Sequence, residues 1–225
     1  MKTLKKLLFV VVLTVTCLSV SIPVFAAKVS MSKEKFNEKK ALGKLMYTTH
    51  KIGSGVVVII KNKNKYTVGV TVDSMFYNKS KMVGTTSDFC YALESGRQCA
   101  LFCPNPTKSN LRPIQYTKYK IKLDVSEAAN VVGNATKIKY AAGITGENLI
   151  LTVKNKGKRA EWTNIAVVFY KKGKIIGYEY HYAYVKQPGS KAYVKYSFPR
   201  DSKYKPIVPD KYKIYVNTSY RFNWQ

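Results

Sequence analysis

The sequence predicts an all-β protein made of two tandem antiparallel β-sandwich domains behind a signal peptide. Three observations predict this class. The first 26 residues have the pattern of an export signal, the rest of the chain repeats itself at an offset of 93 residues, and apolar residues alternate with polar ones within each repeat. Hydrophobic residues make up 46% of the chain, which is enough to bury a core despite a formal net charge of +27.

Residues 1–26 are expected to be a cleaved signal peptide. Three lysines among the first six residues form the charged start, residues 7–13 form an apolar run, and Ala26 ends a small-residue cleavage site. An uncleaved membrane anchor is the alternative, because the apolar character approaches the length that spans a bilayer. We therefore expect a secreted, extracellular protein, with cell-wall association as a further expectation.

The internal repeat defines the domain organisation. A shift of 93 residues places Lys61-Asn62-Lys63 on Lys154-Asn155-Lys156, Phe76-Tyr77 on Phe169-Tyr170, Gly84 on Gly177, Pro106 on Pro199, and Lys118-Tyr119-Lys120-Ile121 on Lys211-Tyr212-Lys213-Ile214, all without a gap. Two copies of one β-sandwich are expected at 30–124 and 125–225. Counted from the expected cleavage site, residues 27–124 and 125–225 each carry 18 basic and 6 acidic residues, so the positive charge belongs to the repeated unit.

Each copy is expected to begin with a short entry helix and to continue with six or seven strands. The helices are placed at 33–42 and 126–132. Alternation or short apolar runs between turn residues predict strands at 56–60, 68–72, 82–91, 98–102 and 118–123, with the best-defined counterparts at 149–153 and 211–216. In the last strand of each copy we expect the apolar residues to be buried and the lysines between them to be exposed; the apolar residues are Tyr119, Ile121, Tyr212 and Ile214.

One hairpin carries a resemblance to a known family. The segment Phe76-Tyr77-x-Lys79-x-Lys81-Met82-Val83-Gly84 and its twin from Phe169 to Gly177 are followed by a turn and a proline-flanked loop before Tyr-Lys-Ile. This pattern resembles the FxLYD-type immunoglobulin-like domains of secreted Gram-positive bacterial proteins, and the similarity covers most of each copy. The resemblance implies two extracellular immunoglobulin-like β-sandwich modules. The Cys, Trp, Cys signature of true immunoglobulin domains is missing.

The residues that usually carry catalysis are scarce, so no enzymatic activity is predicted. His50 and His181 are the only histidines, the repeat pairs neither of them with the other, and their positions fit no zinc motif. The acidic residues are scattered, and only Glu34 and Glu127 are repeated. We therefore expect no catalytic residues, no cofactor and no metal site.

Lysine clusters are the strongest functional signal. Lys61, Lys63 and Lys65 follow the first apolar strand, and they recur in the second copy as Lys154, Lys156, Lys158 and Arg159. The main prediction is a non-catalytic module whose delocalised positive charge holds it to an anionic cell-surface polymer, such as wall teichoic acid or an acidic polysaccharide. The alternative is that these lysines only keep a secreted module soluble. Nucleic acid is not expected as a partner, because the chain is exported and has only five arginines.

Tyrosines suggest a second kind of surface. From Tyr178 to Tyr184 every second residue is a tyrosine, so these side chains share one face of a strand. Tyr182 and Tyr184 align with aromatic residues of the first copy and are expected in the core. Tyr178 and Tyr180 are extra aromatic residues of the second copy and are candidates for stacking on sugar rings. A carbohydrate-binding module is therefore one alternative function, and a structural spacer that binds another protein is a second.

Three cysteines remain after the expected export. Cys90 and Cys99 flank a Glu-Ser-Gly turn at equal distances, so a cross-strand disulfide between them is conceivable. The equally supported alternative is that Cys90, Cys99 and Cys103 are small buried hydrophobic residues with free thiols.

Overall fold

The computed structural model describes residues 36–128, 135–157, 161–185 and 188–218. The expected signal peptide lies outside these ranges. The chain divides into two units, Met1–Lys35 and Phe36–Gln225, and the second unit holds both copies of the repeat. In the described ranges, no helix has the length and apolar character needed to cross a membrane.

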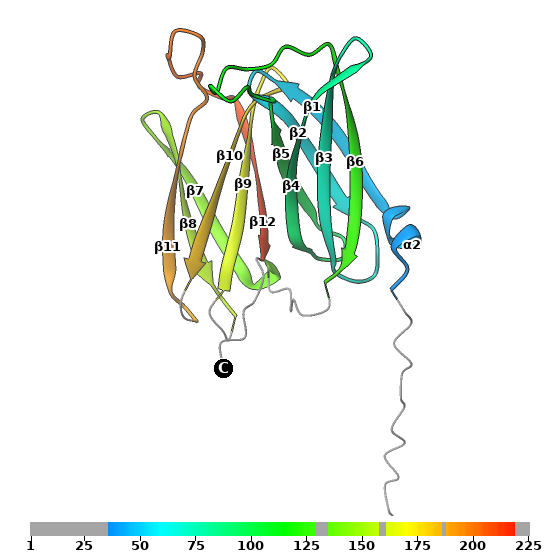
Figure 1. The fold of residues 1–225 in the computed structure, drawn as a ribbon. Coiled ribbons are helices and arrows are strands. Elements are labelled where there is room, and N and C mark those ends of the chain that lie inside the picture. Colours follow the sequence, from blue (N-terminus) through cyan, green and yellow to red (C-terminus); the bar gives the residue numbers. More distant parts are fainter. Residues whose placement is uncertain (1–35, 129–134, 158–160, 186–187, 219–225) are drawn as a thin grey trace, which may run out of the picture. The chain divides into compact units, whose positions relative to one another are not determined.

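The described residues form an all-β fold, which confirms the predicted class (Figure 1). Each copy has two three-stranded antiparallel sheets, β1-β2-β5 and β4-β3-β6 in the first and β11-β8-β7 and β10-β9-β12 in the second. The strands of the first copy are β1 (Leu45–Ile52), β2 (Gly55–Asn62), β3 (Val68–Asn78), β4 (Lys81–Leu93), β5 (Gln98–Pro104) and β6 (Lys118–Glu127). Those of the second are β7 (Ile138–Thr145), β8 (Asn148–Asn155), β9 (Glu161–Lys171), β10 (Lys174–Val185), β11 (Lys191–Ser197) and β12 (Lys211–Thr218).

The offset of 93 residues is preserved in the backbone. Each strand of the second copy begins 93 residues after its counterpart in the first. Residues with positive φ repeat at the same offset, both in the hairpin turn at Lys79 and Lys172 and in the loop before the last strand at Leu111 and Tyr204. The two copies therefore share turn conformations as well as strand order.

Two repeated glycines are explained by close packing against two repeated prolines. Gly84 and Gly177 lie beside β-bulges in β4 and β10. A Cβ atom at Gly84 would overlap the ring of Pro106, and a Cβ atom at Gly177 would overlap the ring of Pro199. The repeated Gly and Pro positions are therefore one structural unit, in which the loop before the last strand approaches the bulged strand closely.

Each copy has its own hydrophobic core between its two sheets. Val56, Val72 and Phe76 lie in the first core, and Leu151 and Phe169 lie in the second. The apolar residues predicted to be buried in the last strands, Tyr119, Ile121, Tyr212 and Ile214, pack against these cores but are only partly buried, while the lysines between them are exposed. Their burial is incomplete because β6 and β12 are edge strands.

The repeated Lys-Asn-Lys motif has a buried asparagine at its centre. Asn62 is fully buried, and its amide nitrogen donates to the carbonyl oxygens of Tyr66 at 2.9 Å and Leu93 at 2.8 Å. Its amide oxygen accepts a hydrogen bond from the backbone of Asn64 at 2.8 Å. Asn155 is also fully buried and accepts from the backbone of Gly157 at 2.7 Å. The motif therefore fixes the turn after β2 and β8, with lysines on the outside.

A third buried cluster joins the two copies. It combines residues from the outer faces of β1-β2-β5 and β10-β9-β12, namely Ile52, Val57 and Ala100 with Ala166, Val168 and Tyr215. On β9, Ala166 and Val168 of this cluster alternate with residues that point into the second core. The whole run Ile165–Phe169 is therefore buried. A strand that is buried on both faces needs an unbroken apolar sequence, which is what β9 has.

Some predicted element boundaries were wrong. The first entry helix is α2 (Glu38–Leu42), and Asn37 caps it by accepting from the backbone amide of Lys40 at 2.9 Å. The second entry helix was placed at 126–132, but β6 extends to Glu127 and residues 129–132 are outside the described ranges. A short 3-10 helix, η1 (Ala135–Lys137), precedes β7 instead. The expected domain boundary at Asp124 therefore falls inside β6.

Candidate functional site

A row of three lysines crosses the outer face of the sheet β11-β8-β7. Lys154 on the central strand β8 is paired directly with Lys139 on β7 and with Lys191 on β11. Directly paired residues have Cα atoms about 5 Å apart, so the row is about 10 Å long. Like charges placed opposite each other destabilise a sheet. The lysine row therefore lowers the stability of the isolated protein.

The same face carries an exposed tyrosine between two of its lysines. On β11 the side chains of Lys191, Tyr193 and Lys195 point outward, because Val194 and Tyr196 lie in the core. Tyr193 is 71% exposed. None of the three strands of this sheet contains an acidic residue. We call this surface, defined by Lys139, Lys154, Lys191, Tyr193 and Lys195, the basic face.

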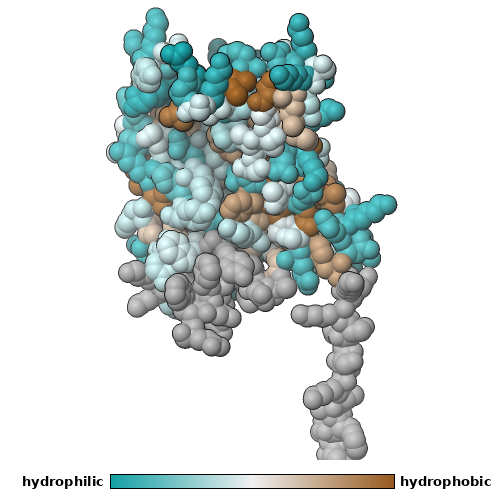
Figure 2. Space-filling model, in the orientation of Figure 1, coloured by the Kyte–Doolittle hydropathy of each residue, from teal (hydrophilic) through white to brown (hydrophobic). Residues whose placement is uncertain are grey.

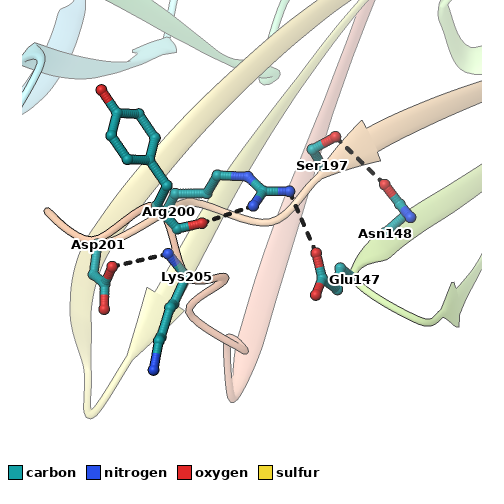
Figure 3. A network of polar contacts seen from close by, with 7 residues as sticks. Glu147, Asn148, Ser197, Arg200, Asp201 and Lys205 are labelled. Carbon is teal, nitrogen blue, oxygen red and sulfur yellow. Dashed lines mark hydrogen bonds and ion pairs between the residues drawn. The ribbon is translucent and has the colours of Figure 1, made fainter.

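The acidic residue in the turn between β7 and β8 is engaged with a loop rather than with the basic face (Figure 3). Glu147 accepts a hydrogen bond from Arg200 at 3.3 Å, and Arg200 also donates to the carbonyl oxygen of Tyr204 at 2.7 Å. Asp201 in the same loop accepts from the backbone amide of Lys205 at 2.9 Å. The charge of Glu147 is thus compensated by Arg200 and not by the lysine row.

The lysine clusters predicted from the sequence do not gather on one surface. Lys63 and Lys65 are exposed in the turn after β2, and Lys156 is exposed after β8. Lys61 lies at the edge of the contact between the copies, while Lys154 is the centre of the row. Lys158 and Arg159 lie outside the described residues.

The lysines of the basic face that local sequence patterns did not reveal come from strands far apart in the sequence. Lys139, Lys191 and Lys195 are not part of a local cluster, and only the pairing of β7 and β11 with β8 brings them together. The alternation of Lys and Tyr from Lys191 to Lys195 is visible in the sequence and would have indicated a polar outer face for β11.

The structure reverses the expected environments of the tyrosines on β10. Tyr182 and Tyr184, expected in the core, are 52% and 40% exposed, so that prediction was wrong. Tyr178 and Tyr180 are partly buried against the cluster that joins the two copies. The hydroxyl of Tyr178 donates to the carbonyl oxygen of Ala100 at 3.3 Å, and burial raises the pKa of Tyr178 well above its usual value.

The physical reason for this reversal is the contact between the copies. The four tyrosines do share one face of β10, but it is the outer face, because Ala183 between them lies in the core. The ring of Tyr178 stacks on Phe102 of the first copy with centroids 5.3 Å apart. The first copy thus covers one end of the tyrosine row. At the other end Tyr184 stacks on Trp162 with centroids 4.5 Å apart, and both rings remain about half exposed.

The three described cysteines are free and buried in the first copy. Cys90 and Cys99 do not face each other within a hairpin, since β4 and β5 belong to different sheets. The two thiols meet across the core, and their hydrogen bond, followed by burial, raises the pKa of Cys99 well above its usual value. Burial also raises the pKa of Cys103 to about 12. The thiols of Cys99 and Cys103 therefore stay protonated and unreactive in the folded protein.

We expect a disulfide between Cys90 and Cys99 to form only while the chain folds. Refolding with oxidised glutathione should convert the two thiols to a disulfide and release two molecules of reduced glutathione, because thiolate chemistry is available before burial. A thiol count in denaturant should then find Cys103 free and Cys90 and Cys99 blocked. The folded, reduced protein should react slowly with the same reagent. A chain that retains all three thiols after oxidative refolding would contradict this pairing.

The His, Cys, Asp and Glu side chains of the described part of the chain bear on the predicted absence of a metal site. Groups of three or more His, Cys, Asp or Glu side chains that could hold a metal ion do not occur among the described residues. His181 is exposed, and its ring packs edge-on against that of Tyr196 with centroids 5.0 Å apart. The face of the protein seen in Figure 2 carries scattered apolar patches between hydrophilic side chains. The basic face is therefore the main candidate for a functional site.

Comparisons with known proteins leave the family open. No family model matches the chain, and no curated protein matches it. Among solved structures, a "putative beta-galactosidase" from Bacteroides fragilis is similar over 64% of this chain, with 12% sequence identity and a TM-score of 0.21. This chain covers only 27% of that protein.

Proposed function

We propose that the protein is a secreted, non-catalytic binding module that attaches to an anionic polymer at the cell surface through the basic face of its second copy. The single observation that carries this proposal is the directly paired row of Lys139, Lys154 and Lys191. An anionic chain lying across the sheet would remove the repulsion within the row. Attachment would therefore be strongest at low ionic strength.

The comparison between the copies supports a role for this face. In the first copy, the positions that correspond to Tyr193 and Lys195 are Ala100 and Phe102, and the second copy covers them. One copy thus uses this face for packing, whereas the other leaves it open and basic. Wall teichoic acid and acidic polysaccharides remain the proposed ligand classes, as the excess of lysine over acid in both copies suggests.

The test is a triple substitution in the row, Lys139→Gln, Lys154→Gln and Lys191→Gln. Because each lysine near an anionic surface contributes about 1 kcal/mol, binding to immobilised polyphosphate or polygalacturonate at low salt should weaken by about a hundredfold. Binding of the unchanged protein should fall steeply as the salt concentration approaches about 0.15 M, where screening acts over about 8 Å. Surface plasmon resonance with dextran as a neutral control measures both effects.

A matched control removes the same charge elsewhere. Lys118→Gln, Lys120→Gln and Lys122→Gln change three exposed lysines of β6, where Lys118 and Lys120 contact the ring of Tyr77 and Lys122 pairs with Asp124 at 2.8 Å. This variant should keep most of the binding. Equal losses in the two variants would contradict a defined face and would leave the net charge as the cause.

A second candidate function is sugar binding by the exposed aromatic residues of the second copy. It is favoured by the stacked pair of Trp162 and Tyr184, which lies on the same strand face as Tyr182. Exposed aromatic rings offer apolar surface to the faces of sugar rings. This function predicts binding to neutral glycans that is insensitive to salt and lost in Tyr184→Ala, whereas polymer attachment through the basic face predicts neither effect.

A further inference from the structure

A cationic cavity lies at one end of the contact between the two copies, and neither the basic face nor the aromatic pair includes it. Its volume is about 370 Å³. The first copy lines it with the end of β2 and the turn before β5, and the second copy lines it with β12. The residues are Lys61, Gly96, Arg97, Gln98, Lys213, Ile214, Tyr215 and Val216.

Three of these residues are cationic and none is acidic. The Nζ atom of Lys213 donates to the amide oxygen of Gln98 at 2.7 Å, so its polar partner is neutral. Among the described residues, no carboxylate forms an ion pair with Lys61 or Lys213. No described carboxylate therefore compensates the positive charge of these two side chains, and the further contact of Lys213 is the Tyr215 ring, whose centroid lies 4.9 Å from Nζ.

Arg97 is held in place by the other copy. One guanidinium nitrogen, Nη2, donates to the carbonyl oxygen of Val216 at 2.9 Å. The Nε atom is buried without a hydrogen bond, and its nearest acidic atom is a carboxylate oxygen of Glu94 at 4.0 Å. The same carboxyl group accepts from the backbone amide of Ala135 at 2.8 Å through its other oxygen. Glu94 therefore compensates the charge of Arg97 only in part.

We propose that this cavity binds a phosphate-type oxyanion, whether free or as a phosphate group of a larger molecule. A multiply charged anion matches a guanidinium and two ammonium groups that have no carboxylate in the lining, and the planar guanidinium suits phosphate oxygens. A neutral ligand would leave Lys61 and Lys213 without a compensating negative charge and Arg97 with only the partial compensation from Glu94. The site is built from both copies, so the bound anion bridges them and stabilises their contact.

The test compares anions at equal ionic strength. Inorganic phosphate should raise the melting temperature of the purified protein in a saturable way, and sodium chloride at matched ionic strength should not. Glycerol phosphate in a parallel titration distinguishes the two sources, since a site for a phosphate group on a larger molecule should bind it at least as tightly as inorganic phosphate. A clearly weaker response to glycerol phosphate assigns the site to the free ion.

Two double variants test whether phosphate binds in the cavity. Lys61→Gln with Lys213→Gln should weaken phosphate binding by about tenfold or more, because two charged donors are lost. Lys139→Gln with Lys191→Gln removes the same charge from the basic face and should leave phosphate binding unchanged while it weakens polymer binding. This control makes failure of the cavity distinguishable from failure of the proposed polymer attachment.

A readout on the unchanged protein completes the test. In NMR spectra, phosphate should shift the backbone amides of Gly96 and Arg97 more than those of β7 and β11. A stabilisation that sodium chloride reproduces, a response that survives the Lys61 and Lys213 changes, or amide shifts that spread over the basic face would each overturn the proposal.

Discussion

Replacement of Asn62 by alanine is expected to lower the free energy of unfolding by about 3 to 5 kcal/mol, because several buried hydrogen bonds are lost at once. The Asn62 side chain bonds to the carbonyl oxygens of Tyr66 and Leu93 and to both the backbone and the side chain of Asn64. Alanine restores none of these bonds and leaves the partner groups buried. Chemical denaturation followed by tryptophan and tyrosine fluorescence measures the loss.

The exposed Asn78 at the end of β3 provides the control for this substitution. Asn78→Ala removes the same side chain from a surface position and should change the free energy of unfolding by less than about 0.5 kcal/mol. The repeat supplies a second check, since Asn155→Ala should destabilise the second copy in the same direction. If Asn62→Ala were as mild as Asn78→Ala, the motif would owe its repetition to its lysines instead of its buried asparagine.

Replacement of Val57 by aspartate is expected to separate the two copies. Val57 is fully buried in the cluster that joins them, and an unpaired charge in such a position costs about 3 to 5 kcal/mol. The chain can avoid most of this cost by opening the contact and exposing the carboxylate. We therefore expect one thermal transition to become two in calorimetry, and the radius of gyration from small-angle scattering to increase.

The repeat also supplies the control for Val57. Ile150 on β8 is 93 residues further along the chain and lies on the open basic face. Ile150→Asp introduces the same charge at the corresponding position of the second copy, so it should leave a single transition and an unchanged radius of gyration. Two transitions in the Ile150 variant, or a single one in the Val57 variant, would show that this cluster does not couple the copies.

The strand positions and the repeat could be predicted from the sequence because they depend on local alternation and on identities at a fixed offset. Which face of each strand is buried could not be predicted, as β10 demonstrates. Alternation showed that Tyr178 to Tyr184 share one side, yet a row of aromatic residues suggests a core, whereas the core side is the one with Ala183. The outer side is partly covered by the other copy, and no pattern within a single copy contains that information.

Sequence differences between the two copies do indicate which strand faces are covered. Ile59 and Phe102, at the contact, correspond to Thr152 and Lys195 on the open face. Such exchanges of apolar for polar residues at equal positions indicate which copy has its outer face covered. The basic face needed a further step, because Lys139, Lys154 and Lys191 meet only through strand pairing. The three lysine positions are far apart in the sequence, so local clusters did not reveal them.

The contact between the copies joins two unlike faces, which makes it heterologous. A heterologous contact can repeat from one molecule to the next when the same faces are free, and it then generates open filaments unless the repeated rotation closes into a ring. Here the free faces carry mismatched residues: Asp73 stands where the second copy has Ala166, and Lys195 stands where the first copy has Phe102. Burial of these charges in a contact between molecules would cost free energy, so we expect them to disfavour such stacking. Replacement of Asp73 and Lys195 by apolar residues is therefore expected to promote polymerisation.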